Sequence, residues 1–303
     1  MRVAVIGAGT MGSGIAQVCA TSGHVVRLHD ASPGKSAEAL VAVRSSLERF
    51  AAKDRLGGQE PDDVLGRIEV APSTGSACEA ADVVIETVVE RLDVKHDVFG
   101  AAVEAAPADA LLATNTSQLS ITQIGSVLGA DASRLVGMHF FNPPVMMQLV
   151  ELVVGLVTSD STVKAAEAFA SGLGKETVVC RKDSPGFLTS RISAIVRLEC
   201  LRMLEEGVGS ASDIDKALRL GLNFPMGPLE LGDFNGLDTY LHALESLERS
   251  LGERFRPTVT LRNLVAAGRL GRKTGHGIYR YAGDGSRVDD GVDGAGAPSG
   301  ANR

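Results

Sequence analysis

The sequence predicts an α/β protein with a mostly parallel sheet in its first part and helices alone in its second. Short apolar runs alternate with Ala-rich helical stretches up to about residue 180, and only helical periodicity follows. The length of 303 residues exceeds the ~250–300 residues that one hydrophobic core usually supports. We therefore expect two domains, at residues 1–183 and 184–282, and a disordered tail at 283–303, where Gly, Asp, Ser and Pro dominate.

The expected elements follow in order along the chain. Seven apolar runs have the length of strands, at residues 3–6, 25–28, 83–85, 110–113, 135–138, 149–154 and 177–180. Helical stretches lie between several of them, at residues 10–22, 35–53, 92–105 and 161–173. Parallel strands need such crossover helices, so the pattern indicates βαβ units. After Ser184-Pro185-Gly186 the expected elements are all helices, at residues 187–206, 212–220, 229–250 and 258–267.

The composition argues against two classes of partner. Lys and Arg number 30 against 37 Asp and Glu, a net charge of −7, and the chain has no Trp and only 3 Tyr. This balance gives no reason to expect a nucleic-acid binder, and stacking on bases is improbable. No apolar run reaches the ~18 residues of a membrane span, so we also expect no membrane association.

The cysteines indicate the compartment. Cys19, Cys78, Cys180 and Cys200 form neither a CxxC motif nor a metal-binding spacing, so we expect buried thiols in a reducing compartment and no metal site. The first strand-like run begins at residue 2, with no signal-peptide pattern before it. We therefore expect a cytoplasmic protein.

A glycine-rich motif follows the first apolar run and opens the first helix. It reads Gly7-Ala8-Gly9-Thr10-Met11-Gly12. Its glycines permit a tight turn, close approach of the backbone to a pyrophosphate and close helix–sheet packing. The helix N-terminus adds free N–H groups and the positive end of its dipole. The motif thus predicts a Rossmann-type doubly wound sheet that binds a dinucleotide, with a purely structural glycine turn as the alternative.

Asp30 indicates which dinucleotide is bound. It ends the second apolar run, near the ~20-residue offset expected for the acid that binds a ribose 2′-hydroxyl. A carboxylate there would repel a 2′-phosphate, and no Arg immediately follows it to bind one. We therefore expect NAD rather than NADP. The alternative is that Asp30 caps a helix beginning at residues 32–35.

His139 and Glu151 form a candidate acid–base pair. Histidine has an ordinary pKa of about 6.5, which suits a general base, and His139 ends an apolar run. Glu151 lies in the next apolar run, beyond the break at Asn142-Pro143-Pro144. Antiparallel neighbours joined by such a turn could bring the carboxylate to the imidazole, where it would fix the tautomer and stabilise the imidazolium. The alternatives are a satisfied core histidine and a solvent-facing glutamate.

Several further motifs resemble the L-3-hydroxyacyl-CoA dehydrogenase family, the enzymes of fatty-acid β-oxidation and their relatives, and they occur in the order that this family shows. They are Glu86-Thr87-Val88-Val89-Glu90 with Lys95, Asn115-Thr116-Ser117, His139-Phe140-Phe141-Asn142-Pro143 with Glu151, Ser184-Pro185-Gly186-Phe187, Pro225-Met226-Gly227-Pro228 with Glu230, and Lys273-Thr274-Gly275-His276-Gly277. The resemblance covers about residues 1–282. It implies NAD-dependent, reversible oxidation of an L-3-hydroxyacyl-CoA thioester to the 3-oxoacyl thioester. It also implies a homodimer formed through the helical domain.

The resemblance assigns roles to individual residues of these motifs. It gives Ser117 a hydrogen bond to the substrate hydroxyl or carbonyl, and it places Glu90 and Lys95 near the NAD ribose and nicotinamide. It lets Asn115 contact the cofactor or the substrate, and it places Asn142 beside the catalytic histidine. Structural alternatives stay open: a helix cap for Ser117, a solvated helix face for Glu90 and Lys95, and turn formation for the two asparagines.

Two positions depart from the family pattern. Ser190 stands where the family usually has an Asn that polarises the substrate carbonyl, and Gln148 stands where a Lys is common. A hydroxyl is shorter than an amide, and a lost polarising donor can cost ~10²–10³ in turnover. The departures fit a specialised hydroxyacyl group on an acyl carrier protein, a free hydroxy acid, or neutral drift with CoA chemistry retained. A non-catalytic NAD(H)-binding homologue is a further possibility, against which the His139/Glu151 pair argues.

Overall fold

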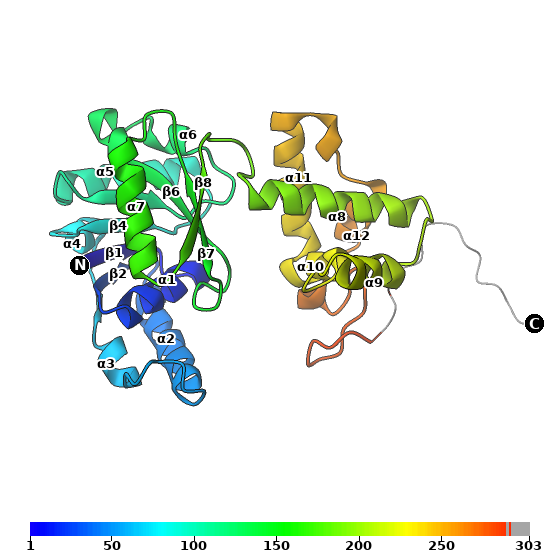
Figure 1. Cartoon of the computed structure of the whole chain (residues 1–303), viewed down its shortest axis with the longest axis horizontal. Helices are drawn as coiled ribbons and strands as arrows, with labels where there is room; N and C mark the ends of the chain where they lie inside the picture. The colour runs from blue at the N-terminus through cyan, green and yellow to red at the C-terminus, as the bar shows by residue number, and fades with distance from the viewer. Residues whose placement is uncertain (289–290, 292–303) are drawn as a thin grey trace, which may run out of the picture. The chain divides into compact units, whose positions relative to one another are not determined.

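The computed structural model divides the chain into two compact units, Met1–Phe187 and Leu188–Arg303, and describes residues 1–288 and 291. Figure 1 shows a sheet with helices in the first unit and helices in the second. The division lies slightly beyond the boundary that we expected after residue 183. Phe187 is the reason, because its side chain is buried in the hydrophobic core of the first unit.

The first unit is built on one eight-stranded sheet in the order β3-β2-β1-β4-β5-β6-β7-β8. Neighbouring strands are parallel except β6 and β7. The strands are β1 Arg2–Ile6, β2 Val25–His29, β3 Ile68–Val70, β4 Val83–Glu86, β5 Leu111–Thr114, β6 Leu135–Phe140, β7 Leu149–Val153 and β8 Glu176–Cys180. The strand order reverses direction between β1 and β4, which confirms the doubly wound sheet. Sheets of this kind bind their ligands at the carboxyl ends of the strands at such a reversal.

Helices cover both faces of this sheet. They are α1 Thr10–Thr21, α2 Lys35–Ala51, α3 Pro61–Leu65, α4 Thr74–Cys78, α5 Leu92–Ala105, α6 Ile121–Gly125 and α7 Asp160–Gly172. Along β1, Val3 and Val5 enter a core shared with α1, α2 and α7, while Ala4 and Ile6 enter a second core shared with α4, α5 and α6. Strands that are buried on both faces read as continuous apolar runs, which is why the sequence reveals them.

The second unit contains helices, as expected. They are α8 Thr189–Glu205, α9 Ala211–Gly221, α10 Pro228–Asn235, α11 Leu237–Leu251 and α12 Val259–Ala266. The single helix expected at residues 229–250 is divided at Gly236, whose φ of +97° belongs to the region that favours glycine. Leu198, Leu229 and Leu244 are fully buried members of the core that joins these helices. Of the helices in the described part of the chain, none is long and apolar enough to cross a membrane.

Two buried carboxylates hold the segment that follows α12. Asp233 accepts hydrogen bonds from Ile278 N at 2.9 Å, Tyr279 N at 2.8 Å and the Tyr281 hydroxyl at 3.1 Å. Asp215 accepts one from the Tyr279 hydroxyl at 2.8 Å. Burial raises the pKa of Asp233 to about 6, although these donors act to lower it. Residues 278–281 are therefore held by the buried carboxylates of Asp215 on α9 and Asp233 on α10.

The first residues of the expected tail, 283–288, are ordered. Val288 N donates to Arg280 O at 3.0 Å, and the Arg287 guanidinium lies 4.5 Å from the centroid of the Tyr279 ring. Residues 283–288 thus continue the ordered segment. The remainder of the expected tail, 289–290 and 292–303, lies outside the described residues. The four cysteines are buried and free, as expected.

Candidate active site

The candidate residues of the first unit gather at one edge of the sheet. The glycine loop follows β1, Glu90 follows β4, Asn115 and Ser117 follow β5, and His139 lies near the end of β6. These strands are consecutive parallel neighbours. Their carboxyl ends therefore share the edge at which open α/β sheets bind ligands.

At two positions of the glycine loop, residues 7–12, an added side chain would collide with neighbouring atoms, and at a third position it would enter open space. Gly7 has a φ of +106°, and a Cβ there would lie 2.7 Å from Thr87 Oγ1. A Cβ on Gly12 would lie 1.8 Å from Gly7 O, so close packing of helix and strand requires both glycines. A Cβ on Gly9 would meet nothing within 4 Å, and Gly9 is exposed. The loop therefore leaves space for a ligand directly before α1.

The start of α1 supplies donors at this space. Gly9 is the N-cap residue and no side chain caps the helix. The first N–H groups of a helix lack intrahelical acceptors, and the helix dipole makes this end attractive to an anion. Thr10 is exposed, whereas Met11 packs partly against the core. Open space, free donors and a positive dipole end together fit a pyrophosphate.

Asp30 is joined to the same loop. Its Oδ2 accepts a hydrogen bond from Ala8 N at 2.7 Å, and its Oδ1 accepts one from Ser32 N at 2.8 Å. Burial acts to raise the pKa of Asp30, but these donors outweigh it, and the pKa lies below its ordinary value. The N-cap of α2 is Gly34, so the helix-cap alternative is wrong. The ionised, half-buried carboxylate suits a ribose hydroxyl and disfavours a phosphate.

His139 and Glu151 lie opposite each other in the antiparallel pair of β6 and β7. His139 Nδ1 is 2.9 Å from Glu151 Oε2. The imidazole is 7% exposed and the glutamate is fully buried. The prediction that the turn brings these two side chains together is thus confirmed, and the alternative of a solvent-facing Glu151 is wrong.

Two aromatic rings lie beside the imidazole of His139. Its ring centroid lies 4.6 Å from that of Phe141 and 6.0 Å from that of Phe187. Nε2 makes no hydrogen bond to any residue that the structure describes. A satisfied core histidine would use both nitrogens. Nδ1 is held by the carboxylate, and Nε2 is left to exchange a proton with a ligand.

Glu90 fixes the loop that follows β5. Its Oε1 accepts hydrogen bonds from the Thr116 hydroxyl and from three backbone N–H groups, Ser117 N at 3.1 Å, Gln118 N at 3.1 Å and Leu119 N at 3.4 Å. The residue that caps α6 is Ser120, which accepts from Gln123 N at 3.1 Å, so the helix-cap alternative for Ser117 is wrong. The Ser117 hydroxyl is therefore not used by the helix.

Lys95 is not on a solvated helix face, because its side chain is only 1% exposed. Its Nζ lies 2.7 Å and 2.8 Å from the two carboxylate oxygens of Glu86 and 3.3 Å from Glu90 Oε2. Glu86 also accepts from the Thr114 hydroxyl at 2.6 Å and from Val88 N at 2.7 Å. Burial raises the pKa of Glu86, while Lys95 and the other donors act to lower it. Lys95 therefore joins β4, β5 and α5 beneath the site.

The remaining predicted residues have separate positions. Asn115 Oδ1 accepts from Phe140 N at 2.8 Å, which ties the end of β5 to β6 beside His139. Asn142 is exposed and precedes a cis peptide bond to Pro143 in the turn between β6 and β7. Ser190 lies in the first turn of α8, in the second unit, and is half-buried.

Sequence reasoning missed three residues that shape this edge. The Thr87 hydroxyl donates to Gly7 O at 2.9 Å, and Asp183 accepts from the Ser120 hydroxyl at 2.5 Å and from Thr122 N at 2.9 Å. Glu86 is the third. It stood in a quoted motif, and a charge that ends an apolar run is a signal of a buried pair.

Comparisons with known proteins are consistent with this site. The family model described as 3-hydroxyacyl-CoA dehydrogenase, NAD binding domain, matches residues 2–184, and the model of the C-terminal domain of 3-hydroxyacyl-CoA dehydrogenase matches residues 186–281. A Bacillus subtilis protein described as a probable 3-hydroxybutyryl-CoA dehydrogenase is 41% identical over 281 residues, 92% of this chain and 97% of that protein. A Deinococcus radiodurans protein with the same description is 40% identical over 282 residues, 93% of this chain and 100% of that protein.

A solved structure is also similar. The crystal structure of (S)-3-hydroxybutyryl-CoA dehydrogenase from Ralstonia eutropha has a TM-score of 0.88 and 41% sequence identity to this chain. The match covers 93% of this chain and 99% of that one. The similarity therefore extends over both units.

Proposed function

The chain belongs to the 3-hydroxyacyl-CoA dehydrogenase family, and from this premise we propose that it oxidises an L-3-hydroxyacyl-CoA thioester with His139 as the general base. It is an NAD-dependent oxidoreductase that acts on a CH–OH group. The assignment of roles to individual residues is our proposal. The observation that carries it is the buried pair of His139 and Glu151 at the ligand-binding edge of the sheet.

The residues at the start of the chain fit NAD. The loop at residues 7–12 and the free N–H groups of α1 would hold the pyrophosphate, and Asp30 would accept a hydrogen bond from a ribose hydroxyl. Thr10 and Met11 belong to this loop and would contact the cofactor. Glu90 and Lys95 would lie near the ribose and the nicotinamide. Bound NAD⁺ supplies the acceptor for the hydride that leaves C3 of the substrate.

His139 would manage the proton of the same reaction. Its Nε2 would take the proton from the substrate hydroxyl while the C–O single bond becomes a carbonyl, so the proton goes to the imidazole and the hydride goes to NAD⁺. Glu151 holds Nδ1 and stabilises the imidazolium that forms, because its buried carboxylate lies 2.9 Å away. In the reverse direction the imidazolium returns the proton to the carbonyl oxygen.

Other polar groups would orient the substrate. We propose that the Ser117 hydroxyl contacts the reacting oxygen, since Glu90 fixes its backbone and leaves the hydroxyl available. Asn115 would hold β6 beside His139, and Asn142 would lie at the rim of the site. Ser190 would meet the thioester carbonyl, in the position that the family usually gives to Asn.

The carrier of the acyl group is the finer part of this proposal. We favour coenzyme A, and the alternatives are an acyl carrier protein and a free hydroxy acid. A panel of one 3-hydroxyacyl group presented on each carrier and as the free acid, followed by NADH absorbance, separates them. A kcat/KM highest for the carrier-protein thioester would contradict our preference for CoA.

We also propose a cytoplasmic homodimer that forms through the helical unit. Leu220, Leu222 and Phe234 are 74%, 68% and 53% exposed there, and burying such apolar side chains against a second copy would favour a dimer. The buried free cysteines are consistent with a reducing compartment. Sedimentation velocity of the wild type checks the dimer, and a monomer at micromolar concentration would contradict it.

The role of His139 is tested with His139→Gln. We expect kcat to fall by ~10²-fold or more while the dissociation constant for NADH, measured by NADH fluorescence, changes little. His242→Gln is the matched control, because His242 is exposed on α11. Full activity of the His139 variant would remove this residue from the mechanism.

A further inference from the structure

Lys175 is a half-buried cation whose partners are backbone carbonyls of the turn between β6 and β7, residues 141–148. Its Nζ donates to Pro144 O at 2.7 Å and to Met147 O at 2.8 Å. In the described part of the chain no carboxylate forms an ion pair with this ammonium, and burial lowers the pKa of Lys175. A cation that loses hydration in this way is stabilised only by well-placed acceptors, so the two carbonyls are the partners that hold it.

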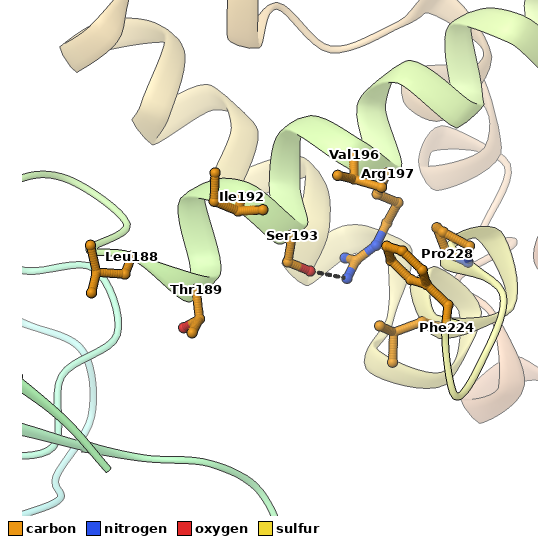
Figure 2. Close-up of a pocket in the computed structure, with 9 residues that line it drawn as sticks. Leu188, Thr189, Ile192, Ser193, Val196, Arg197, Phe224 and Pro228 are labelled. Atoms are coloured by element: carbon orange, nitrogen blue, oxygen red, sulfur yellow. Dashed lines mark hydrogen bonds between the residues drawn. The ribbon is translucent and has the colours of Figure 1, made fainter. Parts of the chain in front are cut away.

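A second buried cation, Arg197, has neighbours of a different kind. It lines a pocket of about 430 Å³ in the second unit, and Figure 2 shows its guanidinium beside Ser193. Its Nη2 donates to the Ser193 hydroxyl at 3.2 Å, and the guanidinium lies 4.5 Å from the centroid of the Tyr240 ring. These contacts are made to side chains. The contacts of Lys175 instead fix the path of the main chain, directly after the strand that carries the proposed base.

The backbone of Lys175 is fixed on both sides. α7 ends in a Schellman motif, in which Lys175 N donates to Ala170 O at 3.0 Å. Gly174 has the positive φ that this motif requires, +70°. Glu176 N then donates to Gln148 O at 2.9 Å, where the pairing of β8 with β7 begins. The side chain of Lys175 therefore starts from a fixed point beside the turn.

The turn takes hydrogen bonds from outside itself because both of its prolines lack an N–H group. The N–H groups of Met146 and Met147 donate to Pro143 O, at 3.0 Å and 3.1 Å. The carbonyls of Pro144 and Met147 accept from the Lys175 ammonium. Backbone carbonyls withdrawn from water require a donor. One side chain from the residue before β8 thus joins two carbonyls of the turn.

α1 also contacts the turn. Pro144 is buried, and a Cβ on Gly14 would lie 2.8 Å from Pro144 Cδ. The lack of a side chain at Gly14 therefore lets the turn pack closely on α1, the helix that follows the cofactor loop. Lys175 and Gly14 act on the same residue of the turn, the first by a hydrogen bond and the second by close packing.

The turn joins the two strands that carry the proposed base and its carboxylate, His139 on β6 and Glu151 on β7. A misplacement of reacting groups by about 1 Å can lower a rate by ~10²-fold. We propose that Lys175 is a positioning residue for His139: by closing the turn it fixes the pairing of β6 with β7 and with it the distance of 2.9 Å between His139 Nδ1 and Glu151 Oε2. The inference rests on the proposed function, because it concerns the base of the same reaction.

The test is a double-mutant cycle on kcat, measured by NADH absorbance. Lys175→Met keeps an unbranched side chain but removes the ammonium, and we expect kcat to fall by about tenfold or more. KM and the dissociation constant for NADH should stay close to those of the wild type. In a His139→Gln background the same substitution should cost nothing further, because Lys175 acts through His139. Equal losses in the two backgrounds would show general damage to the unit and would overturn the inference.

Two further variants make the test specific to the ammonium. Lys175→Arg keeps a cation that can donate to both carbonyls, so it should recover most of the lost kcat. An arginine variant as impaired as Lys175→Met would overturn the role of the donated hydrogen bonds. Lys164→Met is the matched control, since Lys164 is exposed on α7. It should keep the wild-type kcat, and a loss equal to that of Lys175→Met would also overturn the inference.

The outcomes separate this inference from the proposed function. A wild-type kcat in Lys175→Met, with activity lost in His139→Gln, overturns the inference alone. Full activity of His139→Gln overturns the proposed role of the base and the inference together. If Lys175→Met does not fold, Gly14→Ala displaces the same turn at Pro144, while alanine suits the helix interior. It should lower kcat in the wild-type background and not in His139→Gln, and an unchanged kcat would contradict the coupling of the turn to the base.

Discussion

His139 and Glu151 occupy directly paired positions in the register of β6 and β7, with Nδ1 and Oε2 2.9 Å apart. A shift of one residue in this register would turn the carboxylate to the opposite face of the sheet, because side chains alternate along a strand. The pair therefore depends on the turn that reverses the chain after β6. The antiparallel contact is the exception in an otherwise parallel sheet, and it is the one that assembles the proposed base.

Glu151→Gln should disable the base while the fold is kept. Glutamine has nearly the same shape but cannot stabilise an imidazolium, so we expect kcat to fall by ~10²-fold or more. Steady-state kinetics by NADH absorbance give kcat, and NADH fluorescence gives cofactor affinity, which should change little.

Glu176→Gln is the matched control for this variant. Glu176 is exposed on β8, the strand beside β7, and it pairs in register with Leu149. Its kcat should equal that of the wild type. Equal losses in the two variants would show a general effect of charge at this edge and would contradict the specific role of Glu151.

Gly9→Ala should separate cofactor binding from folding. The backbone of Gly9 has a φ of −73°, which alanine adopts, and the added Cβ meets no atom of the protein within 4 Å. The methyl group would instead occupy the space that we assign to the pyrophosphate. We expect an affinity for NADH lower by roughly tenfold, or ~1.4 kcal/mol, and a free energy of unfolding changed by less than ~0.5 kcal/mol.

The control for this loop variant is Gly100→Ala. Gly100 lies in α5, and a Cβ there also meets nothing within 4 Å. Titration of NADH fluorescence should give it the affinity of the wild type. Unchanged affinity in Gly9→Ala would mean that the pyrophosphate does not approach this glycine.

The parts of the fold and site that follow from local sequence were predictable. The buried strands are apolar runs in the sequence. The glycine loop and the turn at Asn142-Pro143-Pro144 are recognised by their residue types. β3 could not be identified because it has three residues, of which Glu69 and Val70 are exposed. The split of residues 229–250 was also missed, since one glycine within a helical pattern is often tolerated.

Contacts between distant segments were less accessible. Glu86 and Lys95 both stood in the motif, but their ion pair depends on how β4 and α5 pack, which periodicity does not specify. The N-cap of α6 was assigned to the wrong serine as an alternative, because Ser117 and Ser120 are both acceptable caps by residue type. The hydrogen bonds from Ser117 N and Gln118 N to Glu90 distinguish the two serines, and these bonds depend on the folded structure.

Lys95→Met should destabilise the first unit strongly. It would leave Glu86 buried without its counterion, and breaking a buried pair in this way costs about 3–5 kcal/mol. Adding Glu86→Gln removes the uncompensated charge, so the double variant should be more stable than Lys95→Met alone. Urea denaturation followed by circular dichroism measures both, and strictly additive effects would contradict the coupling.

Asp233 should make the stability of the second unit depend on pH. Its folded-state pKa of about 6 lies above the ordinary value of about 3.9. Between these values the folded state binds more protons than the unfolded state, so the free energy of unfolding rises as the pH falls. Asp233→Asn lacks this contribution, and the stability difference between wild type and variant should be larger at pH 5 than at pH 7 by about 1 kcal/mol.

The three tyrosines make this measurement specific to the second unit. Tyr240, Tyr279 and Tyr281 all lie there, and the chain has no Trp, so intrinsic fluorescence during urea denaturation reports on that unit. Asp284→Asn is a control of opposite sign, because hydrogen bonds from Ser286 hold the pKa of the exposed Asp284 below its ordinary value. Its contribution is present near neutral pH and is lost as the pH falls through the folded-state pKa. A wild-type advantage over Asp233→Asn that shrinks on acidification would show that the buried carboxylate is ionised at lower cost than its surroundings imply.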